Sequence, residues 1–373
     1  MGDQHVRAVL RLHLADGVGA VTYLRLMRAF GSAESALSAG PAEWVKVPHV
    51  GEKTVAAMAA ITDQDVDEEL AVTERAGARV LTQESVEYPL ALKHIDDPPA
   101  VLYVRGQWRE SDAVSLGVVG SRRCTHYGLE QAQRFGELLG QAGLTVVSGG
   151  ARGIDAAAHR GALRAGGRTV AVMGCGLCTH FPPENGELFE SIVRDGRGAL
   201  MSELPMRTAV LAGNFPTRNR IISGLSLGVL IVEAARRSGS LITARQAVEQ
   251  GKTVFAVPGR VDSPMSQGTN DLIRNGSILT QGLEDILEHL GPVGQSLTAA
   301  KEAEPQLPFA PANMDATEQK IWDTLAAGGR TLDELVRATG LPTAKATAAM
   351  TMLVIKGAVK QNPGNLFARK TSK

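Results

Sequence analysis

Two glycine-rich segments follow apolar runs that are expected to form buried strands. The first is Gly120-Ser121-Arg122, and the second is Ser148-Gly149-Gly150-Ala151-Arg152-Gly153. Glycine lets the backbone approach a bound group closely, and the free N–H groups at a helix start attract anions. Arg122 stands beside the first turn, where its guanidinium could pair with a phosphate in bidentate fashion. Two such turns on neighbouring strands predict a track for successive phosphates rather than one isolated site.

Two later segments add anion-binding groups at the same predicted sheet edge. Ser238, Gly239 and Ser240 follow a buried apolar run, and they can cap the next helix while leaving backbone donors free. Arg218 and Arg220 flank an asparagine before another helix. These arginines either line a binding groove or pair with Glu203 and Glu233 to hold loops in place, and we favour the structural role.

Two other constellations resemble reactive sites. Asp155 and His159 lie one helical turn apart, but no nucleophile or metal-ligand set accompanies them. We therefore expect Asp155 to cap its helix and His159 to pack or hydrogen-bond internally. Cys175 and Cys178, with His180, have redox or zinc spacing, yet the chain offers no second cysteine pair. We expect an incidental loop there and no bound metal.

The elements that must position these residues alternate along the middle of the chain. Between about residues 80 and 290, short apolar runs typical of buried parallel strands alternate with helix-length segments. This pattern predicts a Rossmann-like, doubly wound, mostly parallel α/β sheet. The strand-length runs are Ala113–Val119, Leu144–Ser148, Thr169–Met173, Gly228–Glu233 and Thr253–Val257.

The two ends of the chain are organised differently. Residues 1–75 read as short helices broken by glycine, and Val47–Ala56 has the outline of a helix-hairpin-helix turn, with Gly17-Val18-Gly19 as a degenerate second copy. A plain helical cap is the alternative. Residues 292–312, rich in Pro, Gly, Ala and charge, are expected to form a linker. Residues 313–373 then predict three helices and a β-hairpin, the outline of a winged-helix domain.

Composition limits the class of protein. Lys plus Arg and Asp plus Glu both number 39, so any nucleic-acid surface must be a local concentration of positive charge. From Asp315 to Lys373 there are nine basic and five acidic residues, a net charge of +4. Three cysteines are too few for a disulfide framework and fit a reducing cytoplasm. No apolar run reaches bilayer length, so we expect no membrane contact.

These motifs, in this order, resemble the DNA-processing protein A family (DprA, also called Smf) across nearly the whole α/β region. The matching stretches are Tyr88-Pro89, Pro98-Pro99, Leu102-Tyr103, Gly106, Gly120-Ser121-Arg122, Ser148-Gly149, Gly153-Ile154-Asp155 through His159, Gly166-Gly167-Arg168-Thr169, Ser202-Glu203, Phe215-Pro216, Arg218-Asn219-Arg220-Ile221-Ile222, Ser238-Gly239-Ser240-Leu241-Ile242-Thr243 and Pro258-Gly259. The family often carries a helical N-terminal and a winged-helix C-terminal domain, which this chain also predicts.

The resemblance implies a non-enzymatic protein of natural transformation. Such proteins bind and protect incoming single-stranded DNA, form homodimers through the Rossmann-like domain and load RecA recombinase onto the strand. No cofactor is implied. Arg122 resembles the arginine that grips phosphate, and Arg168 stands where many relatives have a DNA-contacting lysine. The turns at Gly120, Ser121, Ser148, Gly149 and Gly153 resemble the backbone cradle. Relatives usually carry an apolar residue in place of Gly150, and beside this departure Arg152 is a candidate further phosphate contact.

Two alternatives belong to other functional classes. Nucleoside-monophosphate phosphoribohydrolases share a Rossmann-like fold but carry a Pro-Gly-Gly-x-Gly-Thr-x-x-Glu loop with a catalytic glutamate. Here the corresponding turn, Arg237–Thr243, is followed by no acid until Glu249, which argues against hydrolysis. The other alternative is an adaptor whose winged helix and dimer surface are its working parts. DNA affinity that survives deletion of the α/β domain would support that alternative.

Overall fold

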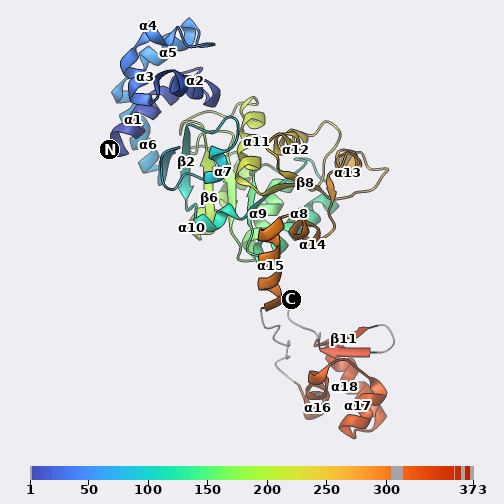
Figure 1. Ribbon diagram of the computed structural model, residues 1–373. Coiled ribbons are helices and arrows are strands. Elements are labelled where there is room, and N and C mark those ends of the chain that lie inside the picture. Colours follow the sequence, from blue (N-terminus) through green and yellow to red (C-terminus); the bar gives the residue numbers. More distant parts are fainter. Residues whose placement is uncertain (1, 304–313, 357, 363–365, 370–373) are drawn as a thin grey trace. The chain divides into compact units, whose positions relative to one another are not determined.

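The computed structural model describes residues 2–303, 314–356, 358–362 and 366–369. The chain divides into two compact units, Met1–Thr298 and Ala299–Lys373 (Figure 1). The first unit contains the predicted helical and α/β regions, and the second contains the predicted winged helix. No helix among the described residues is both long enough and apolar enough to cross a bilayer.

The N-terminal region is a small bundle of helices. Its core holds Leu10, Leu26 and Met58, which are almost completely buried. The two predicted hairpin turns are neighbours, because a Cβ built on Gly17, where φ is +87°, would lie 2.7 Å from the Thr54 hydroxyl oxygen. The helices are α1 (Gly2–His13), α2 (Ala20–Phe30), α3 (Ala33–Ala39), α4 (Pro41–Trp44), α5 (Glu52–Ala60) and α6 (Asp63–Arg75).

The α/β region is built on a nine-stranded sheet of order β1-β2-β6-β5-β4-β3-β7-β8-β9. The pairs β1–β2 and β2–β6 are antiparallel and the other pairs are parallel, which confirms the predicted Rossmann-like class. The strands are β1 (Ala78–Thr82), β2 (Val101–Gly106), β3 (Ser115–Val119), β4 (Thr145–Ser148), β5 (Thr169–Val172), β6 (Gly198–Ser202), β7 (Gly228–Ile231), β8 (Thr253–Ala256) and β9 (Ile278–Leu279).

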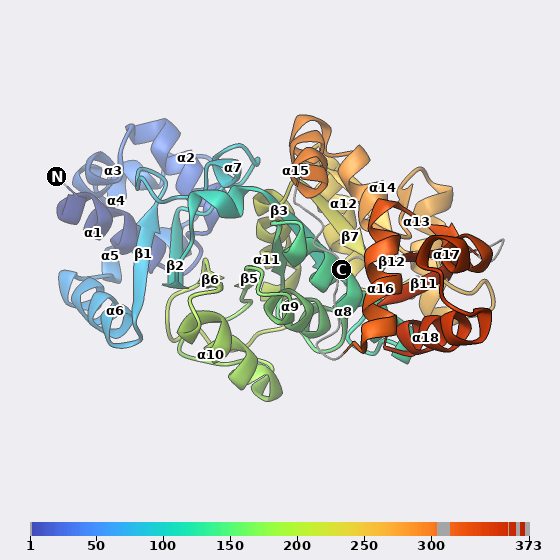
Figure 2. The same ribbon diagram turned by 90° about the horizontal axis from the view of Figure 1, so that it is seen from below.

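Helices cover both faces of this sheet, as Figure 1 and Figure 2 show. Alternate residues of the strands point to opposite faces. Val119 and Ile231 pack beneath α7 (Leu90–Lys93), α11 (Asn214–Leu225) and α12 (Ser240–Glu249). Leu116 and Leu230 pack against the opposite layer. That layer contains α8 (His126–Gln141), α9 (Ile154–Arg164) and α14 (Leu283–Glu288). The remaining α-helices of the region are α10 (Gly186–Arg194) and α13 (Gln267–Arg274).

The segment expected to be a linker is partly regular. Helix α15 spans Gly291–Ala303, so the first part of 292–312 is helical, and residues 304–312 lie outside the described residues. In the second unit, α16 (Ala316–Thr324), α17 (Leu332–Thr339) and α18 (Thr343–Ile355) enclose Ile321 and Leu353. A small sheet of order β10-β12-β11 completes the winged-helix fold, from β10 (Arg330–Thr331), β11 (Val359–Asn362) and β12 (Leu366–Arg369). Of the predicted hairpin turn, residues 363–365 lie outside the described residues.

Candidate functional site

A cavity of about 700 Å³ lies at the carboxyl ends of β3 and β7, where open α/β sheets bind ligands. We call it the carboxyl-edge cavity. The turns after both strands and the first turns of α11 and α12 form its walls. Seven of the predicted site residues line it: Gly120, Ser121, Arg122, Arg218, Ser238, Gly239 and Ser240.

The two predicted glycine-rich turns are in contact beside this cavity. The Ser121 amide donates to the Glu233 carbonyl at 2.8 Å, which fixes the first turn against β7. Gly153 has φ +75°, and a Cβ there would lie 2.5 Å from the Ser121 carbonyl oxygen. A Cβ on Gly120 would lie 2.6 Å from the Ile154 side chain. Glycine is therefore required at both positions, and the close approach holds the two turns as one rim.

Arg122 extends from this rim with its guanidinium exposed. The guanidinium carbon lies 4.8 Å from the centre of the Phe215 ring, a cation–π contact that limits where the side chain can go. The Phe215 ring packs in turn against the Phe181 ring, at a centroid distance of 5.7 Å. Within the described parts of the chain, Arg122 has no carboxylate partner, so its hydrogen-bond donors are available to a ligand.

Three helices begin at the carboxyl-edge cavity. Asp155 in the first turn of α9, Phe215 in the first turn of α11 and Ser240 at the start of α12 all line it. Helix N-termini carry partial positive charge and free N–H groups. The N-cap residues of α11 and α12 are glycines, which have no side chain to cap the helix, and the Ser240 amide of α12 donates to the Ser238 hydroxyl at 3.4 Å. The cavity is therefore electropositive from backbone as well as from side chains.

Ser148 and Gly149 support the rim from behind. The Ser148 hydroxyl donates to the Val118 carbonyl at 2.6 Å, and the Gly149 carbonyl accepts from the Arg218 guanidinium at 2.9 Å. Arg218 is only 4% exposed and also donates to the Val172 carbonyl. Burial lowers the pKa of Arg218 to about 10, although Asp155 opposes the shift. Arg218 is thus a positioning residue that presents little of its side chain to the cavity.

Asp155 is held by the turn that precedes its helix. Its carboxylate accepts from the Gly149 and Ala151 amides at 3.1 and 3.3 Å, and the N-cap of α9 is Gly153. The expectation that Asp155 caps α9 is therefore wrong, because the carboxylate bonds amides of the preceding loop instead. Burial raises the pKa of Asp155, while the neighbouring Arg218 lowers it.

His159 is buried and hydrogen-bonded internally, as expected. Its Nδ1 lies 2.6 Å from the Thr169 hydroxyl, and that hydroxyl donates onward to the Val146 carbonyl. Nδ1 must therefore carry the proton, which leaves the buried Nε2 as an acceptor with no donor among the described residues. Burial lowers the pKa of His159 to about 3. His159 does not line the carboxyl-edge cavity, so Asp155 and His159 form no acid–base pair there.

Three arginines that were predicted to bind phosphate do not line the carboxyl-edge cavity. Arg220 pairs with Asp97 at 2.7 Å and Glu203 at 2.5 Å, which is the structural role that the sequence favoured. The other suggested acid, Glu233, instead accepts from Thr125. Arg152 pairs with Glu184 on the surface. Arg168 lies before β5, at the amino edge of the sheet, away from the carboxyl-edge cavity.

Sequence reasoning did not identify the role of Phe215. An aromatic residue three positions before Arg218 was the available signal, but its contact with Arg122 joins segments far apart in the chain. The cysteines differ in exposure, with Cys175 buried and Cys178 exposed. Nowhere in the described residues do three His, Cys, Asp or Glu side chains come together to hold a metal ion.

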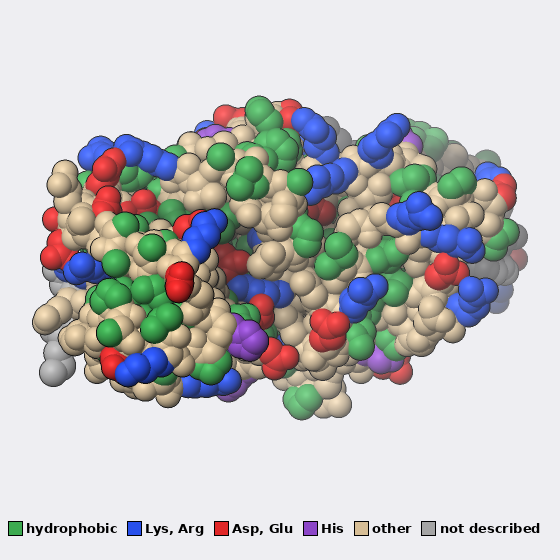
Figure 3. Space-filling model, turned by 90° about the horizontal axis from the view of Figure 1, so that it is seen from above, with side chains coloured by type: hydrophobic (Ala, Val, Ile, Leu, Met, Phe, Trp, Pro, Cys, Tyr) green, Lys and Arg blue, Asp and Glu red, His purple; other side chains and the backbone are tan. Residues whose placement is uncertain are grey.

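Figure 3 shows the molecule from above, with basic, acidic and apolar side chains interspersed on that face. Positive charge does not form one continuous surface there. A neutral chain can bind an anion only through local features, and the carboxyl-edge cavity provides them through its helix N-termini and Arg122.

Known families match all three parts of the chain. Residues 79–291 match the family described as DNA recombination-mediator protein A. Residues 303–365 match the DprA winged helix domain, and residues 3–71 match the DprA-like N-terminal HHH domain. The first match covers more than half of the chain, and the predicted family is confirmed.

Individual relatives agree with these matches. Protein Smf of Synechocystis is 34% identical over 384 residues, covering 95% of this chain and 96% of that protein. Protein Smf of Escherichia coli is 45% identical over 227 residues, or 61% of this chain, and the match spans 60% of the E. coli protein's length. The DNA processing protein DprA of Bacillus subtilis is 40% identical over 222 residues, covering 59% of this chain and 74% of that protein.

Two solved structures resemble the fold. The X-ray structure of DprA from Streptococcus pneumoniae gives a TM-score of 0.68 at 31% identity, covering 76% of this chain and 97% of that chain. DprA from Helicobacter pylori, described for its single-stranded DNA binding mode, gives 0.50 at 29% identity, covering 60% of this chain and 98% of that chain. The chain therefore belongs to the DNA recombination-mediator protein A family.

Proposed function

We propose that this protein binds single-stranded DNA, with successive phosphates held in the carboxyl-edge cavity. The observation that carries the proposal is the position of Arg122. Its exposed guanidinium stands beside the first turns of three helices, and none of the described acids pairs with it. The relative from Helicobacter pylori, whose structure concerns single-stranded DNA binding, supports the same ligand.

The shape of the site favours a single strand over a duplex. A single strand can bend to bring several phosphates into a concave cavity, whereas duplex DNA is stiff. Backbone amides and Arg122 would contact phosphates and leave the base edges unread, so binding should show little sequence preference. Affinity should fall as salt rises, because each phosphate contact releases counterions.

The wider role is proposed on the family resemblance. The protein would act in the cytoplasm during natural transformation, form a homodimer that joins two cavities, protect the incoming strand and load RecA recombinase onto it. Joining two cavities would raise the affinity for long strands through avidity. Loading can be tested by strand exchange with RecA on DNA already coated by a single-strand-binding protein. The proposal predicts that this protein shortens the lag, and an unchanged lag would remove the loading role.

The binding proposal is tested directly by competition. A labelled single strand is bound to the protein and displaced with unlabelled single strand or with duplex of the same length. The proposal predicts that single strand competes at a lower concentration than duplex. Equal competition by both would remove the preference on which the proposal depends.

One observation could favour the hydrolase alternative, namely an acidic residue in the carboxyl-edge cavity. Asp155 is an acid that lines the cavity, and its pKa is raised by burial. However, its carboxylate is bonded to two backbone amides and faces buried Arg218, so its arrangement is structural. Incubation with nucleoside monophosphates should release no free base. Base release that disappears in Asp155→Asn would make the protein an enzyme.

A further inference from the structure

A second cavity, of about 470 Å³, lies at the amino edge of the sheet, where β4, β5 and β6 begin. We call it the amino-edge pocket. Its charged lining consists of Arg109, Arg168, Arg197 and Asp195, and its other lining residues are glycines. Strands of the parallel sheet run from this edge to the carboxyl-edge cavity, so the two cavities are on opposite edges. One phosphate therefore cannot contact both cavities, and each cavity would bind a phosphate of its own.

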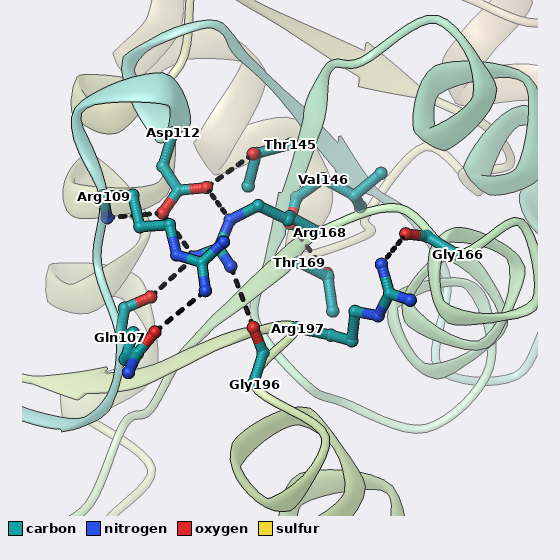
Figure 4. Close-up of polar contacts among 10 residues, drawn as sticks. All are labelled: Gln107, Arg109, Asp112, Thr145, Val146, Gly166, Arg168, Thr169, Gly196 and Arg197. Atoms are coloured by element: carbon teal, nitrogen blue, oxygen red, sulfur yellow. Dashed lines mark hydrogen bonds and ion pairs between the residues drawn. The ribbon is translucent and has the colours of Figure 1, made fainter.

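Arg168 is the fixed centre of the amino-edge pocket (Figure 4). Its Nε and Nη2 bond the two oxygens of buried Asp112 at 2.6 and 2.7 Å. The same guanidinium donates to the Gln107 and Gly196 carbonyls at 2.6 and 3.0 Å. Every nitrogen of this guanidinium already has a protein partner. Arg168 therefore holds the walls of the pocket in place, and a ligand would be bound by the neighbouring arginines.

The neighbouring arginines keep donors free. Arg109 is exposed and donates one bond, from Nη2 to the Gln107 side-chain oxygen at 2.9 Å. Arg197 is exposed and bonds the Gly166 carbonyl through Nη1. A guanidinium has five N–H donors. Both groups line the pocket, so each can offer further donors to an anion there.

Helix C-termini are the opposing feature. Helices α8, α9 and α10 all end beside this pocket, and their last carbonyls carry partial negative charge. A guanidinium lies beside two of these ends, since Arg197 bonds the Gly166 carbonyl after α9 and Arg168 bonds the Gly196 carbonyl after α10. The lining acid, Asp195, is paired with Arg194 at 3.3 Å. Among the described residues, neither Arg109 nor Arg197 forms an ion pair with a carboxylate.

We propose that the amino-edge pocket is a second site for a phosphate of the nucleic-acid backbone, held by Arg109 and Arg197 on the frame set by Arg168. This inference rests on the proposed function, because it assigns the anion to DNA. A short strand seated in the carboxyl-edge cavity would not reach this pocket. A long strand would place a second segment in it.

The test compares strand lengths by fluorescence anisotropy, with oligothymidylates of about 8 and about 40 nucleotides. The variant is Arg109→Ala/Arg197→Ala, and the charge-matched control is Arg28→Ala/Arg75→Ala, two exposed arginines of the helical domain. We expect the variant to bind the long strand on the order of fivefold to tenfold more weakly, with a salt slope reduced by about 1.4. Binding of the short strand should be unchanged.

Two further variants keep the test decisive if the double alanine variant is misfolded. Arg109→Ala alone removes only a bond to the Gln107 side chain, so it should fold and show part of the loss. Arg109→Lys/Arg197→Lys keeps both charges and should recover most of the long-strand affinity. Unchanged long-strand binding, or equal loss for both lengths, would overturn the inference. Failure of the wild type to bind either strand would instead contradict the proposed function itself.

Discussion

The guanidinium of Arg122 lies 4.8 Å from the centre of the Phe215 ring, so the turn after β3 is connected to the first turn of α11 across the mouth of the carboxyl-edge cavity. Arg122 and Phe215 are 93 positions apart in the sequence. The contact uses the face of an aromatic ring rather than a carboxylate, and it restrains the guanidinium without neutralising it. A restrained, uncompensated positive charge is suited to a phosphate ligand.

Phe215→Leu tests this restraint. The substitution keeps an apolar side chain but removes the ring face, which is worth about 0.5–1 kcal/mol to an exposed cation. We expect single-strand affinity to fall roughly two- to fivefold, less than for removal of Arg122 itself. Anisotropy titration measures the loss, and thermal unfolding checks that the fold is intact. Affinity equal to wild type would show that Phe215 does not position Arg122.

Gly153→Ala tests the contact between the two glycine-rich turns. Its positive φ and the Ser121 carbonyl 2.5 Å from the new Cβ should cost about 1–3 kcal/mol in unfolding free energy. Gly213→Ala is the matched control, because φ there is −66° and no atom of the described residues lies within 4 Å of the added Cβ. Urea unfolding measures both. Equal stability of the two variants would contradict the tight approach of the turns.

Asp112→Asn tests the assignment of Arg168 to a structural role. The buried carboxylate accepts from Arg168, from the Thr145 hydroxyl at 2.8 Å and from the Arg109 amide at 2.7 Å. Removing its charge should lower the unfolding free energy by about 3–5 kcal/mol. Short-strand affinity of the folded protein should stay unchanged, because the carboxyl-edge cavity is on the other edge. A loss below about 1 kcal/mol would contradict this role.

The buried His159 predicts a pH dependence of stability. Its pKa is lowered to about 3 in the folded protein, below the ordinary value of 6.5, so the unfolded state binds more protons between these values. Stability from this group is therefore complete above about pH 6.5 and is lost as pH falls toward 3. The slope from one such group is at most about 1.4 kcal/mol per pH unit.

The measurement for His159 is a difference between two proteins. Urea unfolding of wild type and His159→Gln is followed from pH 7 to pH 4, so that contributions from carboxylates cancel. The variant is expected to lose less stability over this range. Parallel curves for the two proteins would show that His159 does not titrate in this way.

The sequence predicted the strands that are continuous apolar runs, including Thr169–Val172 and Gly228–Ile231, because such runs are typical of buried parallel strands. It did not single out β1, β2, β6 or the two-residue β9. In β6, Ala199, Leu200 and Met201 also suit a helix. Within residues 1–75 the sequence predicted short helices but did not place one at α6, although Thr62 and Asp65 form a capping box at the start of that helix.

Among the site residues, the sequence placed best those that sit directly after a strand. Gly120 to Arg122 follow β3, and a parallel strand fixes the edge at which its carboxyl end lies. Arg168 precedes Thr169, so strand direction alone puts it at the amino edge, apart from the glycine-rich turns at the carboxyl edge. The partners of Arg220 could not be inferred, because Asp97 is more than 100 positions away and reaches it only through the fold.

The most direct test of the phosphate-binding cavity is Arg122→Ala in a salt series. Anisotropy of a labelled single strand and its duplex is measured for wild type, Arg122→Ala and the Arg28→Ala control. We predict that wild type and Arg28→Ala prefer the single strand. Arg122→Ala should lose on the order of tenfold or more in affinity, with a shallower dependence on salt. If Arg122→Ala binds as wild type does, the carboxyl-edge cavity does not hold the strand, and the binding surface must lie in the helical or winged-helix region.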